Sequence, residues 1–246
     1  MIRYAYLLVA LIAGWGGAAV AQSDMTADLP EKVVLARLSN VPDQYIGGEI
    51  LKAVYAKLDV KVEFIDVEAA RALELSSSGQ IDGEIQRIPA VARQFPSLIR
   101  IDTPMNFIEP SAFTRNLDIP IDGWPSLAGY DIGIVHGVGS SEAGTKGMKS
   151  VQAATSLENL IQMLDRGRFQ VMVTDLVSGE IAIRKLGLAN RIHALSPPLQ
   201  HIDLYHYLNQ KNRVLAQRVS AVLAEMAASG ELQKLHEKLV NQLLAN

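Results

Sequence analysis

The sequence contains no cysteine. This absence excludes disulfide bonds, thiolate metal sites, cysteine nucleophiles and lipid attachment at cysteine. An excess of charge of one sign is also missing, because 23 Lys and Arg face 26 Asp and Glu, for a net charge of −3. A chain this near neutral has no overall field to attract nucleic acid or an anionic membrane surface, so we expect no nucleic-acid partner.

The composition is otherwise that of a globular protein. The 246 residues are 49% hydrophobic and 20% charged, which excludes a disordered or collagen-like chain. The length suits one large domain or two domains of about 100 residues each.

The N-terminus has the pattern of an export signal. Arg3 precedes an apolar run over residues 4–13, and Ala19-Val20-Ala21 forms a small-x-small cleavage site. The run is too short to span about 30 Å of hydrocarbon, and no later run is long enough, so an uncleaved anchor is the less favoured alternative. We expect a signal peptide over residues 1–21 and a mature periplasmic protein that is not membrane-embedded, since an exported chain without disulfides suits that compartment.

The mature chain alternates strand and helix patterns, which predicts parallel-type sheets flanked by helices. In the first half, strands are expected over residues 32–38, 60–65, 81–88 and 98–101, with helices over 44–58 and 69–75. In the second half, strands are expected over 131–136 and 170–174, with helices over 156–166, 176–186, 213–228 and 231–244. Thr155 and Glu158 have the spacing of a capping box for the helix that follows them.

Two proline-rich breaks divide this pattern, at residues 116–125 and 196–198. We therefore predict an α/β fold of two lobes around a hinged cleft: residues 22–115 form the first lobe, 116–200 the second, and 201–246 return to the first. The crossings are expected near residues 112–116 and 199–208. Small ligands bind in such clefts, whereas two independent domains without a shared cleft are the alternative.

Four stretches carry a resemblance to a known family. They are residues 79–83 (GQIDG), 127–137 (LAGYDIGIVHG), 164–175 (which ends RFQVMVTD) and 222–239 (which contains SGEL). In this order and spacing the chain resembles a divergent member of the family 3 extracellular solute-binding proteins. That resemblance implies the type 2 periplasmic binding fold and uptake of polar amino acids through an ABC-type permease. It also implies that Asp175 receives the ligand's ammonium group.

The family's carboxylate-binding T-x-x-R element has no clear counterpart. The threonine is missing, and either Arg87 or Arg93 stands in place of the usual arginine. Arg71 lies where a helix follows the second expected strand, and Arg87 ends the extended segment over residues 82–87. Two guanidinium groups at such loop ends are suited to clamp a carboxylate or phosphate. Both arginines are therefore candidate ligand residues, with ordinary surface arginines as the alternative.

The turn over residues 136–142 is a second candidate, because backbone N–H groups at a helix N-terminus favour an anion. Gly139, Ser140 and Ser141 are its predicted ligand residues, and an ordinary helix cap is the alternative. The turn misses the dinucleotide pattern at Glu142 and the hydrolase pattern at Ala143.

Three further candidates complete the predicted binding site. Asp175 ends a buried strand and either binds the ligand or caps the next helix. Glu84 lies two residues after Asp82, on the same face of the expected strand, and is placed in the cleft. Tyr45 opens a helix and is suited to stack on a ligand.

The favoured function is binding of a small polar, carboxylate-bearing or amino-acid-like solute for transport, with a permease or sensor as partner. No catalytic residue, cofactor or metal site is expected. His201 and His206 are five positions apart and face opposite sides of one extended segment, and the other three histidines lie on different elements. A monomer is expected. The alternatives are a dehydratase that uses Glu84 as its acid and a sensory module without a permease.

Overall fold

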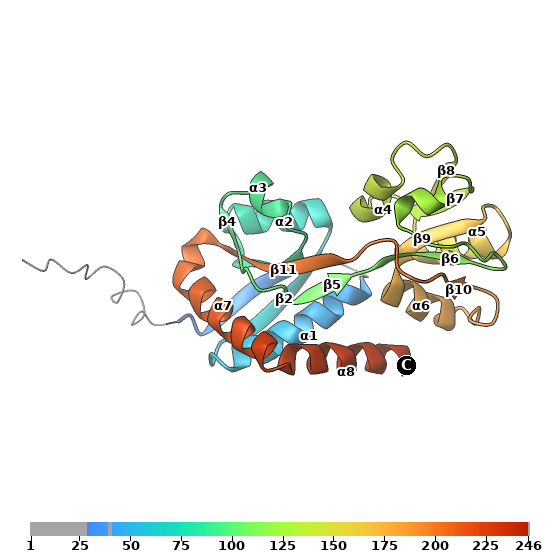
Figure 1. Ribbon diagram of the computed structural model, residues 1–246. Coiled ribbons are helices and arrows are strands. Elements are labelled where there is room, and N and C mark those ends of the chain that lie inside the picture. The colour runs from blue at the N-terminus through green and yellow to red at the C-terminus, as the bar shows by residue number, and fades with distance from the viewer. Residues whose placement is uncertain (1–28, 39–40, 246) are drawn as a thin grey trace, which may run out of the picture.

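A computed structural model describes residues 29–38 and 41–245, which form two lobes side by side (Figure 1). The expected signal peptide, residues 1–21, lies outside the described residues. No described helix is both long and apolar enough to cross a membrane.

The first lobe is built on a mixed sheet in the order β2-β1-β3-β11-β4, with β5 paired to β11. Strand β1 pairs in parallel with β2 and β3, whereas β11 runs antiparallel to β3, β4 and β5. These strands are β1 (Lys32–Leu38), β2 (Lys61–Val67), β3 (Gly83–Arg87), β4 (Leu98–Arg100), β5 (Asn106–Ile108) and β11 (Ile202–Asn209).

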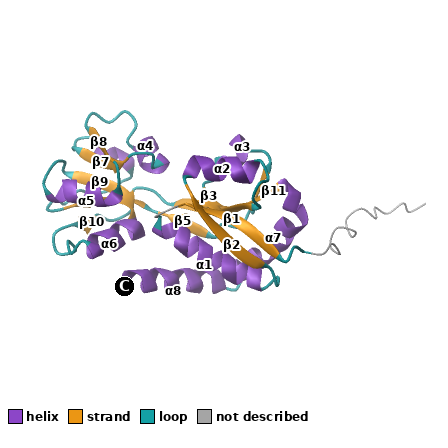
Figure 2. Ribbon diagram, turned by 180° about the vertical axis from the view of Figure 1, so that it is seen from behind, coloured by secondary structure: helices purple, strands orange, loops and turns teal. Residues whose placement is uncertain are grey.

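Helices cover both faces of this sheet (Figure 2). Those of the first lobe are α1 (Pro42–Ala56), α2 (Ala69–Ser77), α3 (Val91–Gln94), α7 (Arg213–Ala228) and α8 (Glu231–Ala245), with the short 3-10 turn η3 (Gln210–Asn212) before α7. The apolar face of α1 packs with α7 and α8 in the largest core; Ile50, Leu51, Val219 and Leu223 are fully buried there. Burial of each such side chain contributes about 1.5–3 kcal/mol.

The second lobe has a five-stranded sheet in the order β10-β6-β9-β7-β8. Strand β7 pairs in parallel with β8 and β9, and β6 pairs antiparallel with β9 and β10. Its elements are β6 (Pro110–Thr114), η2 (Trp124–Leu127), β7 (Ile132–Val135), α4 (Gly139–Gly144), β8 (Val151–Ala154), α5 (Leu157–Asp165), β9 (Val171–Asp175), α6 (Leu176–Lys185) and β10 (His193–Ala194).

The chain crosses between the sheets twice. It leaves the first sheet at β5, and after Glu109 strand β6 already pairs with β9 of the second sheet. The first crossing was expected near residues 112–116, but Ala112 pairs with Val173, so the crossing lies earlier. Residues 116–125 form a loop of the second lobe, because β6 and β7 on either side of it belong to that sheet. The return strand β11 pairs antiparallel with β5, so a two-stranded ribbon joins the lobes.

The cap of α5 differs from the expected one. Its N-cap is Ser156, whose Oγ accepts a hydrogen bond from the Asn159 backbone N at 3.2 Å. The Thr155 hydroxyl instead accepts one from the Asn159 side chain at 2.9 Å. The capping-box pattern was therefore misplaced by one residue, since adjacent Thr and Ser both suit an N-cap and the backbone decides between them.

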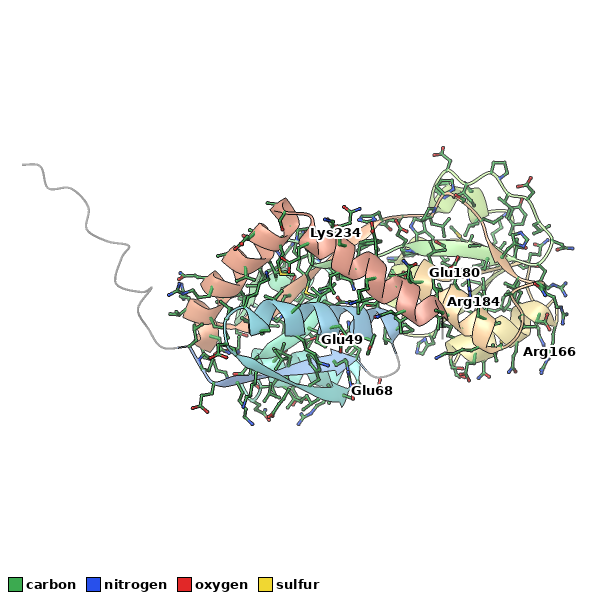
Figure 3. The ribbon with its side chains drawn as sticks, turned by 90° about the horizontal axis from the view of Figure 1, so that it is seen from below. Glu49, Glu68, Arg166, Glu180, Arg184 and Lys234 are labelled. Atoms are coloured by element: carbon green, nitrogen blue, oxygen red, sulfur yellow. The ribbon has the colours of Figure 1, made fainter. Side chains whose placement is uncertain are left out.

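Helix α8 gives the lobes a further contact. Val177 of α6 packs against the first-lobe core. The Arg184 Nη1 atom donates to the Leu244 carbonyl oxygen near the end of α8, at 3.4 Å (Figure 3). The lobes are thus joined by the β5–β11 ribbon and by the packing of α6 against the C-terminal helix.

Candidate functional site

Two carboxylates from opposite lobes lie beside the ribbon and interact through their charges. Asp43 lies in the first turn of α1, and Asp175 ends β9 and caps α6. The Asp175 carboxylate accepts hydrogen bonds from the backbone N of Ser178 and of Glu109, both at 3.0 Å. Its negative charge is one of the causes that raise the pKa of Asp43. Asp175 therefore caps α6, which is one of the two predicted alternatives, and its charge acts on Asp43 of the first lobe.

A buried amide network holds Asp43. The Gln86 Nε2 atom donates to the Asp43 Oδ2 at 2.7 Å, and the Asn106 Nδ2 atom donates to the Asp43 carbonyl oxygen at 3.2 Å. Asn106 also donates to the Gln86 Oε1 at 3.0 Å, while its own Oδ1 is buried without a partner among the described residues. Burial, followed by the charge of Asp175, raises the pKa of Asp43 to about 7.

Large apolar side chains are exposed in loops and helix starts that follow strands of both lobes. Of the four large apolar side chains that are most exposed in the described chain, three come shortly after the carboxyl ends of β1, β3 and β7: Tyr45, Ile88 and Val138. Their exposed fractions are 44%, 42% and 38%. Tyr45 and Ile88 belong to the first lobe, and Val138 precedes α4 on the side of the second lobe nearest the first (Figure 1). Apolar surface left open at these positions is suited to contact a ligand.

Glu84 and Arg87 form an ion pair inside the first lobe. Glu84 is buried on β3 and accepts hydrogen bonds from the Ser76 Oγ, at 2.9 Å, and from the Arg87 Nε. The Arg87 Nη2 atom also donates to the Ala69 carbonyl oxygen at 3.0 Å. Burial raises the pKa of Glu84, although Arg87 and Ser76 act to lower it. The pair therefore joins α2 to β3.

The second arginine of the proposed clamp has its own partner. Arg71 lies on α2, and its Nη1 is 2.7 Å from the Glu74 Oε2 on the exposed face of that helix. The structure brings Arg87 to the first turn of the helix that carries Arg71, but each guanidinium pairs with a carboxylate of its own lobe. Arg93 is exposed on α3.

The turn over residues 136–142 is occupied by its own carboxylate. Gly139, Ser140 and Ser141 begin α4, and Ser141 is buried. The Glu142 Oε1 accepts a hydrogen bond from the Gly137 backbone N at 2.8 Å. This carboxylate places negative charge where the sequence predicted an anion site.

Two histidines pack against Phe107 of β5: His201, which directly precedes β11, and His236 of α8. The Phe107 ring is 4.7 Å from the rings of both His201 and His236. The two ring nitrogens of His201 are each 3.2 Å from a carboxylate oxygen, that of Glu109 and that of Asp203. Among the described residues, no three His, Asp or Glu side chains are grouped so as to hold a metal ion.

Sequence reasoning missed Asp43, Gln86 and Asn106. Asp43 lies in the first turn of α1, where an acidic residue is explained by its favourable interaction with the helix dipole. Gln86 and Asn106 are amides on strands and belong to no recognisable motif. Only the packing of α1 against β3 and β5 brings them together.

Comparisons with known proteins fit this arrangement. No family model matches the chain. An uncharacterized protein of Shewanella oneidensis is 24% identical over an alignment of 192 residues that covers 74% of this chain and 71% of that protein.

Three solved structures of the same architecture are similar over most of both chains. The GluR0 ligand-binding core in complex with L-glutamate has a TM-score of 0.71 at 12% identity, over 87% of this chain and 99% of that one. An ancestral arginine-binding protein bound to glutamine has a TM-score of 0.65 at 19% identity, over 86% of this chain and 99% of that one. A histidine kinase sensor domain with similarity to periplasmic binding proteins has a TM-score of 0.65 at 18% identity, over 85% of this chain and 95% of that one. The chain thus has the two-lobed α/β fold of the type 2 periplasmic binding proteins.

Proposed function

We propose that this protein binds a small amine-bearing solute between its lobes, and that an amino acid or related compound is that solute. The observation that carries the proposal is that Asp43 and Asp175, held on opposite lobes beside the ribbon, interact through their charges. An ammonium group between two carboxylates offsets their repulsion and forms charge-assisted hydrogen bonds. Binding to both lobes then favours a closed arrangement over an open one.

The rest of the ligand is inferred from the surrounding side chains. Tyr45, Ile88 and Val138 offer apolar contact, so a ligand with an apolar part is favoured. The paired state of Arg71 and Arg87 argues for amine recognition as the main polar contact. Two of the similar proteins hold an amino acid, which supports ligands of that size.

Isothermal titration of the purified protein tests this function. The ligand panel comprises monoamines, zwitterionic amino acids, carboxylates without an amine, and phosphates. We expect binding by amine-bearing ligands, and at least a tenfold loss of affinity in both Asp43→Asn and Asp175→Asn. Asparagine still caps a helix, so Asp175→Asn keeps α6 intact.

Asp118→Asn serves as the matched control, because Asp118 is exposed on a loop of the second lobe. Binding only of carboxylates or phosphates, or binding unchanged in both inter-lobe variants, would contradict the proposal.

We further propose that the protein works in the periplasm and delivers its solute to an inner-membrane permease. The apolar run and Ala19-Val20-Ala21 site support export. Recovery of the protein in the periplasmic fraction with Gln22 as its first residue is the expected result. A sensor partner is the second candidate, supported by the similar histidine kinase sensor domain. Co-purification with a kinase rather than a permease would favour it.

Binding without turnover is part of the same proposal. A general acid must reach the substrate, but Glu84 already accepts hydrogen bonds from Ser76 and Arg87. Prephenate and arogenate are therefore expected to remain unchanged when incubated with the protein. Their conversion, abolished in Glu84→Gln, would favour the dehydratase alternative.

A further inference from the structure

A groove lies on the outer part of the second lobe, along the free edge of its sheet. It has a volume of about 250 Å³ and is bounded by the end of β8 and one face of α5. The lining residues are Ala153, Ala154, Thr155, Asn159, Gln162, Met163 and Arg166. Four of them, at positions 159, 162, 163 and 166, recur at the spacing of one helix face. Figure 3 shows Arg166 at the end of the second lobe that lies farthest from the first.

Strand β8 presents unpaired backbone groups to this groove. It is the last strand of its sheet and, among the residues that the structure describes, it pairs only with β7. The carbonyl oxygens of Ser150 and Ala154 accept hydrogen bonds from the flanks of β7, at Ile132 and His136. Because backbone groups alternate in direction along a parallel strand, those of Val151 and Ala153 point away from β7. Ala153 is also a groove residue, so the free hydrogen-bonding edge and the hollow coincide.

This edge lacks two of the features that keep sheet edges from pairing, charged side chains and proline. At the edge strand β2, Glu63 and Asp66 form ion pairs with Lys32 and Arg37 of β1. Strand β8 reads VQAA, without charge or proline, and its Val151 is 37% exposed. Charged side chains and prolines normally protect an exposed edge, so β8 is left competent to accept another strand.

Positive charge lies beside the same groove. Arg166 lines the groove, and Arg168 lies on the turn that follows it. The Gln152 side chain holds that turn by donating a hydrogen bond from its Nε2 to the Arg168 carbonyl oxygen, at 3.2 Å. Neither guanidinium has a hydrogen-bond or ion-pair partner in the part of the chain that the structure describes. An acidic side chain on an incoming strand would form charge-assisted hydrogen bonds there.

We propose that β8 and α5 form a docking site for an extended polypeptide segment of another protein, which adds to the sheet as a strand and places an acidic side chain against Arg166. Main-chain hydrogen bonds to Val151 and Ala153 provide the affinity, and Met163 and Arg166 select the side chains. The site lies away from Asp43 and Asp175, so it does not depend on the proposed solute site.

The probe is a capped heptapeptide of alternating Thr and Val with a central Glu, titrated into the ¹⁵N-labelled protein. We expect saturable binding, with the largest amide shifts at Val151, Ala153 and Arg166. Ala153→Pro removes only an outward N–H and suits an edge strand, so it is expected to weaken binding at least tenfold. Arg166→Glu is expected to do the same, and a central Lys in the peptide to restore binding to that variant. Arg168→Glu tests a neighbouring charge outside the groove and is expected to have a smaller effect.

Two outcomes would overturn the proposal. One is the absence of saturable binding, or equal binding by the wild type, Ala153→Pro and Arg166→Glu. The other is self-association of the chain that Ala153→Pro abolishes, because the edge would then serve a second copy. Amine binding between the lobes, measured on the same variants, is expected to stay unchanged and separates this test from that of the solute site.

Discussion

Asp43 and Asp175 come from opposite lobes, and the charge of Asp175 adds to the burial that raises the pKa of Asp43 to about 7. Burial raises the pKa of Asp175 as well. The packing of α6 against α1 and α8 thus keeps two carboxyl groups beside the ribbon, where full ionisation is unfavourable. A cationic ligand and a change of pH both act on this pair.

The pair predicts an opposite pH dependence for ligand binding and for stability. Asp43 ionises as the pH rises through about 7, so the affinity for an amine is expected to increase between pH 6 and pH 8, and this increase is lost in Asp43→Asn. Titration calorimetry at the two pH values measures it. An affinity for a monoamine that falls over this interval would contradict the assignment.

The stability of the free protein is expected to change the other way. The folded pKa of Asp43 is raised above that of the unfolded chain, so the folded state binds more protons between about pH 4 and pH 7. The stability from this group is fully present below that window and is lost as the pH rises through it. Relative to the wild type, Asp43→Asn should therefore gain stability from pH 5 to pH 8, as measured by urea unfolding. A difference that stays constant with pH would show that Asp43 titrates normally.

The Glu84–Arg87 pair predicts a strong non-additive effect. Both side chains are nearly buried, so Arg87→Met leaves a carboxylate without its counter-charge and is expected to cost about 3–5 kcal/mol. The double variant Glu84→Gln/Arg87→Met should lose less than the sum of the single variants, since no buried charge remains. A double-mutant cycle in urea measures this, and additive losses would contradict the buried pair.

A buried hydrogen bond between a tyrosine and a histidine gives a further test. The Tyr55 Oη and His206 Nε2 atoms are 2.8 Å apart, and the His206 Nδ1 is 2.7 Å from the Glu84 carbonyl oxygen. Nδ1 therefore donates and Nε2 accepts from Tyr55. Tyr55→Phe leaves Nε2 without a donor and should cost about 1–3 kcal/mol in urea unfolding. Tyr45→Phe, at an exposed position, is the control and should change stability little.

His206 also predicts a loss of stability in acid. Burial lowers its pKa to about 4, below the value of 6.5 for an unperturbed histidine. The unfolded chain therefore binds more protons between these values, and stability falls as the pH drops from about 6.5 toward 4. His206→Gln should flatten this part of the stability profile, and an unchanged slope would argue against a buried neutral imidazole.

At the N-terminus of α5, the adjacent residues Ser156 and Thr155 are expected to contribute differently to stability. Ser156→Ala removes the acceptor for the Asn159 backbone N and should cost about 1 kcal/mol in thermal or urea unfolding. Thr155→Ala removes only an exposed side-chain contact and should cost less. The reverse order would support the cap expected from the sequence.

The sequence alone determined the alternation of strands and helices. Residues 32–38 form a strand because β-branched and apolar residues suit a buried sheet, and α1 follows from apolar residues at helical spacing. Local patterns also placed β7, β9 and α6 close to their observed bounds. Strands β5 (NFI), β6 (PSAFT) and β8 (VQAA) were not predicted, because they lack the run of β-branched and apolar residues that marks β7 (IGIV) and β9 (VMVTD).

Only the tertiary structure decided which polar groups meet. Arginine is a residue type that binds anionic ligands, so the sequence predicted a clamp at Arg71 and Arg87. In the folded chain they form ion pairs with Glu74 and Glu84 instead, on α2 and on the strand β3 that α2 covers. Asp43, Gln86 and Asn106 are spread over 63 positions of the sequence and belong to no common motif. Their hydrogen bonds and the raised pKa of Asp43 arise from burial at the junction of the lobes, and burial is a property of the folded chain rather than of any local stretch.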